Sequence, residues 1–570
     1  MQKRIKIIKV LIVFSFLVVV FRLFLIMFIE HETYYERAKI QQIKREEILS
    51  KRGNIYDRKG RELAISLEKD SLFIDPKQID SSLTLNMVAQ YVNFDLNSFD
   101  KNKRFIWLSR KLDSNEVEKI KSLNLKGVGF IPEGHRFYPK GILASHILGV
   151  VNIDEKGVEG LELYYDKYLK GEKTSRTFLT DAKGKKLSDG ELLEIRGNDI
   201  YTTIDEGLQA IVERHIDEAM KKWRASTATA IMMDPFTGEI LAMAVRPTYD
   251  PNNIALIKNM AVLRNRAITD LYEPGSTFKI VTAAAALEES IVKPYTKFDC
   301  SAGYIEVGGK KIKDVHRYGV LTFEEIIQKS SNVGTIKVAM ILGKERLYQY
   351  IRKFGFGEKT GIDLPGEIAG YVKPPQKWSG TSIGAIPIGQ EVGVTALQML
   401  RAYSVLANGG YLVKPYVVSE IHSQDGKILY KAVIKRERII SENTAKTMKE
   451  ILKKVTEEGG TAPLAKIDGN KVAGKTGTAQ KYDLKVKRYS RDKYVSSFVG
   501  FIPADDPRIA LIVVIHEPKG AYYGGVVAAP VFKAISDEAL SYLNVPREDA
   551  VQKGLVITLK GENHKVLVAR

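Results

Sequence analysis

Glu273-Pro274-Gly275-Ser276-Thr277-Phe278-Lys279 places a serine three residues before a lysine, directly ahead of the alanine-rich run 280–287. Such a run favours a helix, and Pro274 with Gly275 is typical of a turn just before one. We therefore expect Ser276 to open a helix, with Lys279 one turn further along the same face. This is the S-x-x-K pattern of enzymes in which a lysine activates a serine.

Two further motifs lie downstream. By itself, a serine and a lysine at this spacing also fit the solvated start of a helix. Ser330-Ser331-Asn332 forms an S-x-N motif, and Lys475-Thr476-Gly477-Thr478 forms a K-T-G motif. Because the three motifs occur together and in this order, the chain resembles the penicillin-binding proteins and, through them, the serine β-lactamases.

The composition indicates a large, basic protein. A length of 570 residues suggests several domains, and Lys plus Arg outnumber Asp plus Glu by 87 to 68. Apart from clusters in residues 183–186 and 481–493 the cations are scattered, and without a nucleic-acid motif we expect no nucleic-acid partner. Anionic lipid or cell-wall polymer fits this surface better. Cys300 is the single cysteine and the eight histidines show no metal-ligand spacing, so we expect no disulfide, metal or other cofactor.

Residues 10–29 predict a membrane anchor. They are apolar except for Ser15 and Arg22, and their number suffices to span a bilayer. The run is too long for a signal-peptide core and no small-residue cleavage site follows, so we expect it to stay uncleaved. Arg22 either snorkels to an interface or contacts a partner helix. The cations in residues 1–9 favour a cytoplasmic N-terminus, although further cations follow the span.

Several stretches narrow the resemblance to class B penicillin-binding proteins. Residues 52–64 contain a type I turn at 57–60 and predict a strand hairpin; they also resemble the signature that opens the non-catalytic pedestal of this class. Residues 157–162 resemble a second pedestal signature. Within the class, the division-type transpeptidases (penicillin-binding protein 3 type) are most similar, through residues 246–253, 312–315, 328–334 and 522–525. One departure is Ala396, where the family usually has proline, and we expect a looser helix start there.

The resemblance implies an α+β protein with an N-terminal transmembrane helix, an elongated, mostly-β pedestal and a transpeptidase domain built on an antiparallel sheet flanked by helices. The expected divisions are a cytoplasmic tail 1–9, an anchor 10–29, a pedestal 30–195, a transpeptidase domain 196–545 and a C-terminal tail 546–570. A charged helical stalk is expected over 30–49. The strands expected in the catalytic sheet are 228–233, 239–245, 475–480, 496–502 and 508–516. Residues 322–325 form a capping box that predicts a helix start, and 528–543 predict a closing helix.

The resemblance also assigns the site. The catalytic residues it implies are Ser276, Lys279, Ser330, Asn332 and Lys475, and the substrate-binding residues are Thr476, Gly477 and Thr478. A serine hydroxyl needs a base, and Lys279 can serve only when neutral. Burial and the Lys475 charge are expected to lower its pKa. Lys475 itself is expected to lie nearer solvent and stay charged.

The implied reaction begins when Ser276 attacks the carbonyl between the two terminal D-alanines of a cell-wall stem peptide. The backbone N–H groups of Ser276 and Thr478 form the oxyanion hole, and Ser330 relays a proton to the departing D-alanine. Asn332 holds the substrate amide and Lys279, and Lys475 with the two threonines binds the terminal carboxylate. Gly477 lets the substrate strand approach closely.

The predicted function is therefore a peptidoglycan D,D-transpeptidase acting at the division septum, with a possible D,D-carboxypeptidase side activity, and a target of β-lactams. The alternatives are an elongation-type transpeptidase, a penicillin sensor, a β-lactamase and a non-enzymatic division scaffold. The expected partners are stem peptides ending in D-Ala-D-Ala, the membrane, other division proteins and a polytopic lipid II glycan polymerase of the shape-elongation-division-sporulation family. The expected location is the cell (inner) membrane, single-pass, with the catalytic domain periplasmic or extracytoplasmic.

Overall fold

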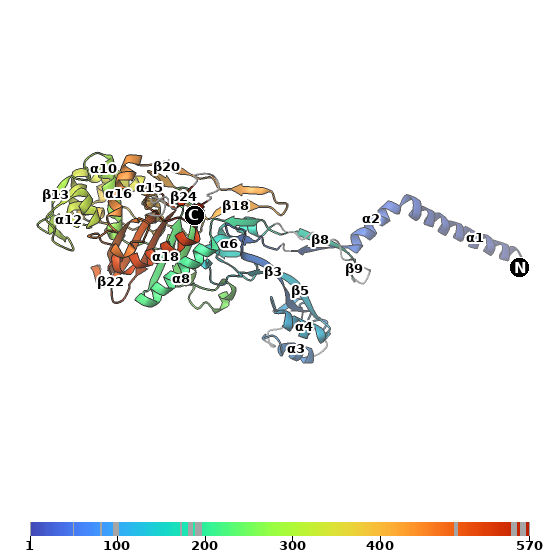
Figure 1. The fold of residues 1–570 in the computed structure, drawn as a ribbon. Coiled ribbons are helices and arrows are strands. Elements are labelled where there is room, and N and C mark those ends of the chain that lie inside the picture. The colour runs from blue at the N-terminus through green and yellow to red at the C-terminus, as the bar shows by residue number, and fades with distance from the viewer. Residues whose placement is uncertain are drawn as a thin grey trace. The chain divides into compact units, whose positions relative to one another are not determined.

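Two units with interleaved sequences make up the protein. The computed structural model describes residues 2–48, 51–79, 82–94, 102–171, 174–180, 186–188, 196–483, 488–548, 556–558 and 566–568. The first unit comprises Met1–Arg52, Glu68–His135 and Lys170–Gly197, and the second comprises Gly53–Leu67, Arg136–Leu169 and Asn198–Arg570. The chain thus passes between the two units several times (Figure 1).

The first unit begins with the apolar helix. α1 (Gln2–Phe24) continues through a π-helical turn, η1 (Leu25–Ile29), and together they are long and apolar enough to cross a membrane. This helix contains the predicted span and starts earlier, taking in most of the expected tail. Arg22 Nη1 lies 3.0 Å from Glu30 Oε1. The cation therefore has a partner within its own chain, just beyond the helix end, which neither sequence interpretation of Arg22 had included.

The expected helical stalk is only partly present. α2 (His31–Gln42) is helical, but residues 43–48 form a strand, β1 (Ile43–Ile48), because they pair with β8 (Thr174–Thr180), which in turn pairs with β9 (Lys186–Ser188). The rest of this unit holds β4 (Ile106–Ser109), most of β5 (Val128–Phe137), α3 (Ser82–Ala89) and α4 (Ser114–Ser122). A small core of its own contains Leu72, Val88, Val92, Leu112, Val117 and Ile120.

In the second unit, a first sheet has the order β19-β18-β10-β2-β3, with β2 (Ile55–Tyr56), β3 (Glu62–Ile74), β10 (Asp199–Thr202), β18 (Val418–His422) and β19 (Ile428–Lys431). The first part of β3 belongs to this unit. The hairpin predicted over 52–64 is confirmed, since β2 and β3 pair antiparallel. Its turn is closed by the Gly60 N–H, which donates to the Asp57 carbonyl at 3.1 Å. The Asp57 carboxylate accepts from the N–H groups of Lys59 and Arg61.

Arg136 connects the two pedestal-like signatures through a buried ion pair and a hydrogen bond. Arg136 Nε donates to Glu162 Oε1 at 2.5 Å, and both side chains are fully buried. Arg136 Nη1 also donates to the Gly53 carbonyl at 2.7 Å, within the first signature stretch. The resemblance of these stretches thus has a structural basis, because a buried charge requires a partner placed at this position.

Removal of the Glu162 charge is expected to destabilise the protein strongly. Glu162→Gln leaves the Arg136 guanidinium buried without its counter-charge, and we expect a loss of about 3–5 kcal/mol in the free energy of unfolding. Glu538→Gln is the matched control, since the Arg214–Glu538 pair is half-exposed and exposed pairs contribute less than about 1 kcal/mol. Urea denaturation of both variants measures the difference, and equal losses would contradict the prediction.

The main sheet of the second unit has five antiparallel strands in the order β12-β11-β23-β22-β21. They are β11 (Thr227–Met233), β12 (Ile240–Arg246), β21 (Ala473–Asp483), β22 (Arg488–Ile502) and β23 (Ile509–His516). All five predicted strands are confirmed. β21 and β22 are longer than the strands predicted over 475–480 and 496–502, because Tyr482 still pairs with Tyr489.

Helices flank this sheet (Figure 1). α8 (Glu206–Trp223) and α18 (Ala529–Tyr542) pack together and on the sheet, and α15 (Ala396–Ala407) packs against β11, β22 and β23. The predicted closing helix is confirmed as α18, and the short helix α17 (Gly524–Val527) precedes it. The start of α15 is closed by a capping box between Thr395 and Gln398, so Ala396 does not loosen it. Beyond residue 546 a tail was expected, but β24 (Val556–Thr558) and β25 (Val566–Val568) pair, as β-branched residues favour.

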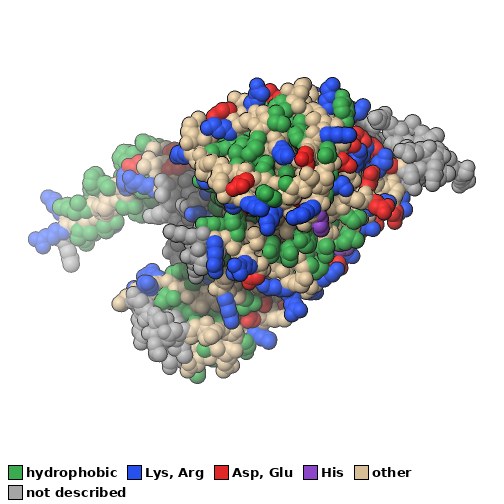
Figure 2. All heavy atoms as spheres, turned by 90° about the vertical axis from the view of Figure 1, so that its left-hand side faces the viewer, with side chains coloured by type: hydrophobic (Ala, Val, Ile, Leu, Met, Phe, Trp, Pro, Cys, Tyr) green, Lys and Arg blue, Asp and Glu red, His purple; other side chains and the backbone are tan. Residues whose placement is uncertain are grey.

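Short elements complete the second unit. Before the main sheet lie α5 (Ser145–Leu148), β6 (Val150–Val151), β7 (Gly157–Glu159), α6 (Gly160–Tyr164) and α7 (Asp166–Leu169). Between β12 and β21 in the sequence lie η2 (Pro251–Leu256), η3 (Met260–Leu263), α9 (Arg266–Thr269), η4 (Gly275–Phe278), α10 (Lys279–Glu288), β13 (Lys297–Asp299), β14 (Tyr304–Val307), β15 (Lys310–Lys313), β16 (Val320–Thr322), α11 (Phe323–Gln328), α12 (Asn332–Leu342), α13 (Lys344–Lys353), η5 (Pro375–Lys377), α14 (Ser382–Ala385), η6 (Ile386–Ile388), β17 (Tyr411–Val413), β20 (Arg436–Arg438), α16 (Glu442–Lys453) and η7 (Pro463–Ala465). Figure 2 shows cations and anions interspersed over one face of the molecule.

Candidate active site

The S-x-x-K serine lies in a turn that leads into a helix. Ser276 belongs to the 3-10 turn η4, and the α-helix α10 begins at Lys279; the predicted helix thus starts three residues later than Ser276. The Gly275 N–H donates to the Gly389 carbonyl at 3.1 Å. A Cβ on Gly389 would lie 2.0 Å from the Gly275 carbonyl oxygen, so only glycine permits this contact. Ser276 is half-buried whereas Thr277 is buried, which leaves the serine within reach of a substrate.

Lys279 is fully buried and points at the S-x-N motif. Its Nζ donates to the Ser330 carbonyl at 2.6 Å, to Asn332 Oδ1 at 2.8 Å and to Ser330 Oγ at 3.2 Å. Burial lowers the pKa of Lys279 to about 7, against the opposing effect of the Asp314 carboxylate. A substantial neutral fraction therefore exists near neutral pH, as a general base requires.

The S-x-N motif lies between two helices, as predicted. The capping box of Thr322 and Glu325 opens α11, which ends at Gln328, and Asn332 begins α12. Ser330 has a φ of +59°, a left-handed conformation that costs a non-glycine residue about 1–3 kcal/mol. Its neighbours maintain it, and it brings both the carbonyl and the hydroxyl of Ser330 to Lys279.

Lys475 approaches the same hydroxyl from β21. Its Nζ donates to Ser330 Oγ at 2.9 Å, and its side chain is fully buried. Burial, followed by the charge of Lys279, lowers the pKa of Lys475 well below its usual range. The expectation that Lys475 lies nearer solvent was therefore wrong, and burial works against the charge that it was expected to keep. Two cations that share one hydroxyl in a dry site repel each other, and Lys279, with three acceptors and Asp314 nearby, keeps its proton more readily.

The K-T-G strand packs tightly on the serine turn. The Thr476 hydroxyl shares a hydrogen bond of 2.9 Å with the Thr461 hydroxyl, and Thr478 Oγ1 accepts from the Gly524 N–H at 2.9 Å. A Cβ on Gly477 would lie 2.3 Å from Ser497 Oγ and 2.8 Å from the Pro274 carbonyl oxygen. Glycine is therefore needed here for internal packing of the strand on the turn that carries Ser276.

Gly477→Ala is expected to damage the site through packing. The added methyl group forces the serine turn away from β21, which we expect to cost about 1–3 kcal/mol of stability and to slow acylation of Ser276. Gly319→Ala is the matched control, because a Cβ there meets no atom within 4 Å. Thermal unfolding and the rate of labelling by a penicillin measure both effects. Wild-type behaviour of Gly477→Ala would contradict the packing described here.

Residues that the sequence did not single out also contribute. Asp314, after β15, accepts from the Ser331 hydroxyl at 2.8 Å and the Val333 N–H at 3.1 Å. Glu273 accepts from the Tyr489 hydroxyl at 3.0 Å and the Glu391 N–H at 2.9 Å, and burial raises the pKa of its carboxyl. Glu273 and residues 312–315 belong to stretches quoted in the sequence analysis. Their hydrogen-bond partners could not be predicted there, because those partners are distant in the sequence.

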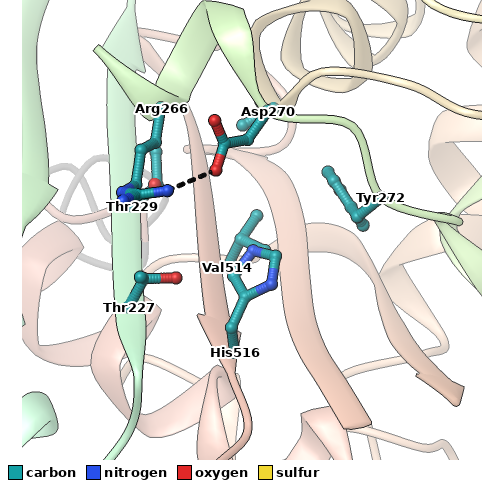
Figure 3. A pocket seen from close by; sticks show the side chains of 8 residues that line it. Thr227, Thr229, Arg266, Asp270, Tyr272, Val514 and His516 are labelled. Atoms are coloured by element: carbon teal, nitrogen blue, oxygen red, sulfur yellow. Dashed lines mark hydrogen bonds and ion pairs between the residues drawn. The ribbon is translucent and has the colours of Figure 1, made fainter. Parts of the chain in front are cut away.

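Two cavities lie apart from the three motifs. The smaller, of about 10 Å³, is lined by His516, Tyr272 and the Arg266–Asp270 pair, whose Nη1 and Oδ2 atoms are 2.7 Å apart (Figure 3). It has room for one water molecule at most. Burial lowers the pKa of His516 to about 4, so the ring is neutral. The larger, of about 410 Å³, lies between α16 and the segment before β21 and is lined partly by lysines. Neither contains a residue predicted for catalysis.

Comparisons with known proteins agree with this arrangement. Residues 228–537 match the family model of the penicillin binding protein transpeptidase domain, and residues 47–202 match that of the penicillin-binding protein dimerisation domain. Stage V sporulation protein D of Bacillus subtilis is 37% identical over 97% of this chain and 88% of its own length. Peptidoglycan D,D-transpeptidase FtsI of Escherichia coli K12 is 33% identical over 91% of this chain and 88% of its own.

Solved structures are similar over most of the chain. Penicillin binding protein 3 from Mycobacterium tuberculosis, complexed with aztreonam, has a TM-score of 0.70 and 29% identity, and the match covers 88% of this chain and 98% of that one. A peptidoglycan synthetase from Bifidobacterium adolescentis has a TM-score of 0.71 and 25% identity, covering 89% and 98%. With both family domains present and the three motifs gathered in one site, the chain belongs to the class B penicillin-binding proteins.

Proposed function

We propose that this chain is a peptidoglycan D,D-transpeptidase that works through an acyl-enzyme on Ser276. The observation that carries the proposal is the convergence of two buried lysines on Ser330: Lys279 and Lys475 both donate to its hydroxyl, at 3.2 and 2.9 Å. They come from a helix and a strand far apart in sequence, next to the turn that holds Ser276. The named activity of relatives such as FtsI supports the same reaction.

In the first half of the reaction, neutral Lys279 takes the proton of the Ser276 hydroxyl as its oxygen attacks the carbonyl between the two terminal D-alanines. The negative charge that develops on the carbonyl oxygen is stabilised by the backbone N–H groups of Ser276 and Thr478. The C–N bond then breaks, and the departing D-alanine needs a proton. Ser330, hydrogen-bonded to both lysines, passes it on.

Substrate binding prepares the base. The terminal carboxylate binds to Lys475, Thr476 and Thr478, and an anion beside Lys475 favours its charged form. A second full charge next to Lys279 then disfavours the proton on Lys279. The carboxylate therefore shifts the proton within the lysine pair, so that Lys279 is neutral when the substrate is in place.

In the second half, an amine of a neighbouring stem peptide attacks the acyl-enzyme and forms the 4→3 cross-link, which releases Ser276. Attack by water instead gives the D,D-carboxypeptidase side reaction. A β-lactam acylates Ser276 in the same way, and slow release of its opened ring accounts for inhibition. Asn332 holds the substrate amide in both halves.

We also propose the cellular setting. The helix Gln2–Ile29 anchors the chain in the cell membrane with the N-terminus in the cytoplasm and the catalytic domain outside. The divisions 30–195 and 196–545 serve as pedestal and transpeptidase domain, supported by family matches that lie within or close to them. Polymerisation of glycan falls to a polytopic lipid II polymerase, and the septum is the site of action. The Bacillus subtilis relative favours sporulation as a second setting, and localisation of a fluorescent fusion during division and sporulation distinguishes the two.

Uncross-linked glycan strands with pentapeptide stems provide the test of activity. The purified full-length protein in detergent should release D-alanine and form cross-linked stems, and a penicillin should abolish both. Release of D-alanine without any cross-link would indicate a carboxypeptidase. Continuous hydrolysis of the penicillin would indicate a β-lactamase. Either result contradicts the proposal.

A further inference from the structure

Asp314 lies at the start of α12, next to the S-x-N motif. Its Oδ1 accepts from the N–H groups of Asn332 and Val333, the latter at 3.1 Å, and its Oδ2 accepts from the Ser331 hydroxyl at 2.8 Å. The first N–H groups of a helix have no partner within the helix and carry partial positive charge. One carboxylate thus caps α12 and ties down the motif in front of it.

The neighbouring residue fixes the orientation of Asn332. The Lys313 carbonyl accepts from Asn332 Nδ2 at 2.9 Å. Because the amide nitrogen is held on that side, Asn332 Oδ1 is left to accept from Lys279 Nζ at 2.8 Å. Residues 313 and 314 together therefore determine which atom of Asn332 faces the base, and they hold Ser331 next to Ser330.

Among the described residues, few charges act on Lys279. Lys475 faces it from β21, and Asp314 is the anion that acts on it from the α12 side. The Cys300 thiol and the Tyr318 phenol also lie near Asp314, and burial raises the pKa of both. They are therefore neutral near neutral pH. The protonation of Lys279 depends on the balance between one anion, one cation and burial.

We propose that Asp314 is a positioning residue of this site, which holds Ser330 and Asn332 against Lys279 and whose negative charge sets the pH at which Lys279 becomes a base. The inference rests on the proposed role of Lys279 in acylation. Asp314 binds Ser331, Asn332 and Val333, and it acts on the reaction through the S-x-N motif.

The sign of the effect follows from the charge. The carboxylate stabilises the ammonium form of Lys279, so its removal lowers the pKa of Lys279. Acylation requires the neutral amine, and its rate rises with pH as that form appears. In Asp314→Asn this rise should therefore occur at a lower pH. The asparagine has almost the same shape and its Oδ1 can still accept from the helix amides, so the fold of α12 is maintained.

The experiment measures the rate of acylation by a labelled penicillin as a function of pH, on the full-length protein. We expect the midpoint of the rise to fall by about one pH unit in Asp314→Asn, in the range that a nearby charge produces. Asp314→Glu keeps the charge and should keep the wild-type midpoint, even with a lower plateau. Asp299→Asn is the control, since Asp299 is exposed and its carboxylate accepts from Ser301 outside the site.

A role in folding alone would reduce the plateau or the unfolding temperature without a shift of the midpoint, so a folded Asp314→Asn with the wild-type midpoint overturns the inference. Should that variant not fold, Asp314→Ser, whose hydroxyl can still accept from the Asn332 amide, is judged by the same criterion. A wild-type protein that takes up no label would instead overturn the proposed function, and this inference with it.

Discussion

Ser276→Ala should lose covalent labelling by penicillin, with a fall of more than about 10³-fold in the rate of acylation, because removal of a nucleophile eliminates the step itself. Ser276 lies half-buried in η4, directly before α10 and the buried Lys279. The Ser330 hydroxyl is hydrogen-bonded to both lysines, and we assign it the role of proton relay.

Peptide mapping of the labelled wild-type protein should place the label on Ser276. Ser301→Ala is the matched control, since Ser301 is exposed and binds Asp299 away from the site; it should label as the wild type does. Label on any other residue, or undiminished label in Ser276→Ala, would show that the assigned nucleophile is wrong.

Substitution of Lys279 and substitution of Lys475 should have different effects. Lys279→Ala should abolish acylation and leave non-covalent affinity nearly unchanged, because the base acts only as the bond forms. Lys475→Ala should weaken binding, because a charge-assisted hydrogen bond to the terminal carboxylate contributes about 1.5–3 kcal/mol. That corresponds to roughly a tenfold to hundredfold loss of affinity.

The burial of Lys475 adds a pH effect. In Lys475→Ala no charged lysine stands beside Lys279 when the ligand carboxylate is bound, so the pKa of Lys279 in the complex rises and the acylation rate should increase only at higher pH than in the wild type. Acylation rates measured against pH and ligand concentration separate these effects, with the exposed Lys344→Ala as control. If Lys279→Ala kept its acylation rate and lost only affinity, the two roles would have to be exchanged.

The sequence predicted well those features that local patterns determine. The hairpin at 52–64, the capping box at Thr322 and the antiparallel strands each depend on residues close together in the chain. The three motifs identified the site because their order and spacing are specific. The S-x-N motif was also placed correctly on a connection between helices, since the capping box fixed where α11 begins.

Features that depend on distant partners were missed. The burial of Lys475 follows from which face of β21 meets Ser330, and a strand pattern does not reveal what covers that face. Asp314 looks like a loop residue until the fold brings it to the start of α12. The stalk ends at Gln42 because residues 43–48 pair with a segment far along the chain, and Gly477 is required by Ser497 and Pro274.

Mass spectrometry can detect the acyl-enzyme on the natural substrate. The full-length protein would be mixed with a stem peptide ending in D-Ala-D-Ala, without an acceptor amine, quenched during turnover and digested. We predict an adduct equal to the peptide minus one D-alanine on the fragment that carries Ser276, and none in Ser276→Ala. An adduct on another residue, or cross-linking by Ser276→Ala at the wild-type rate, would contradict the proposed mechanism.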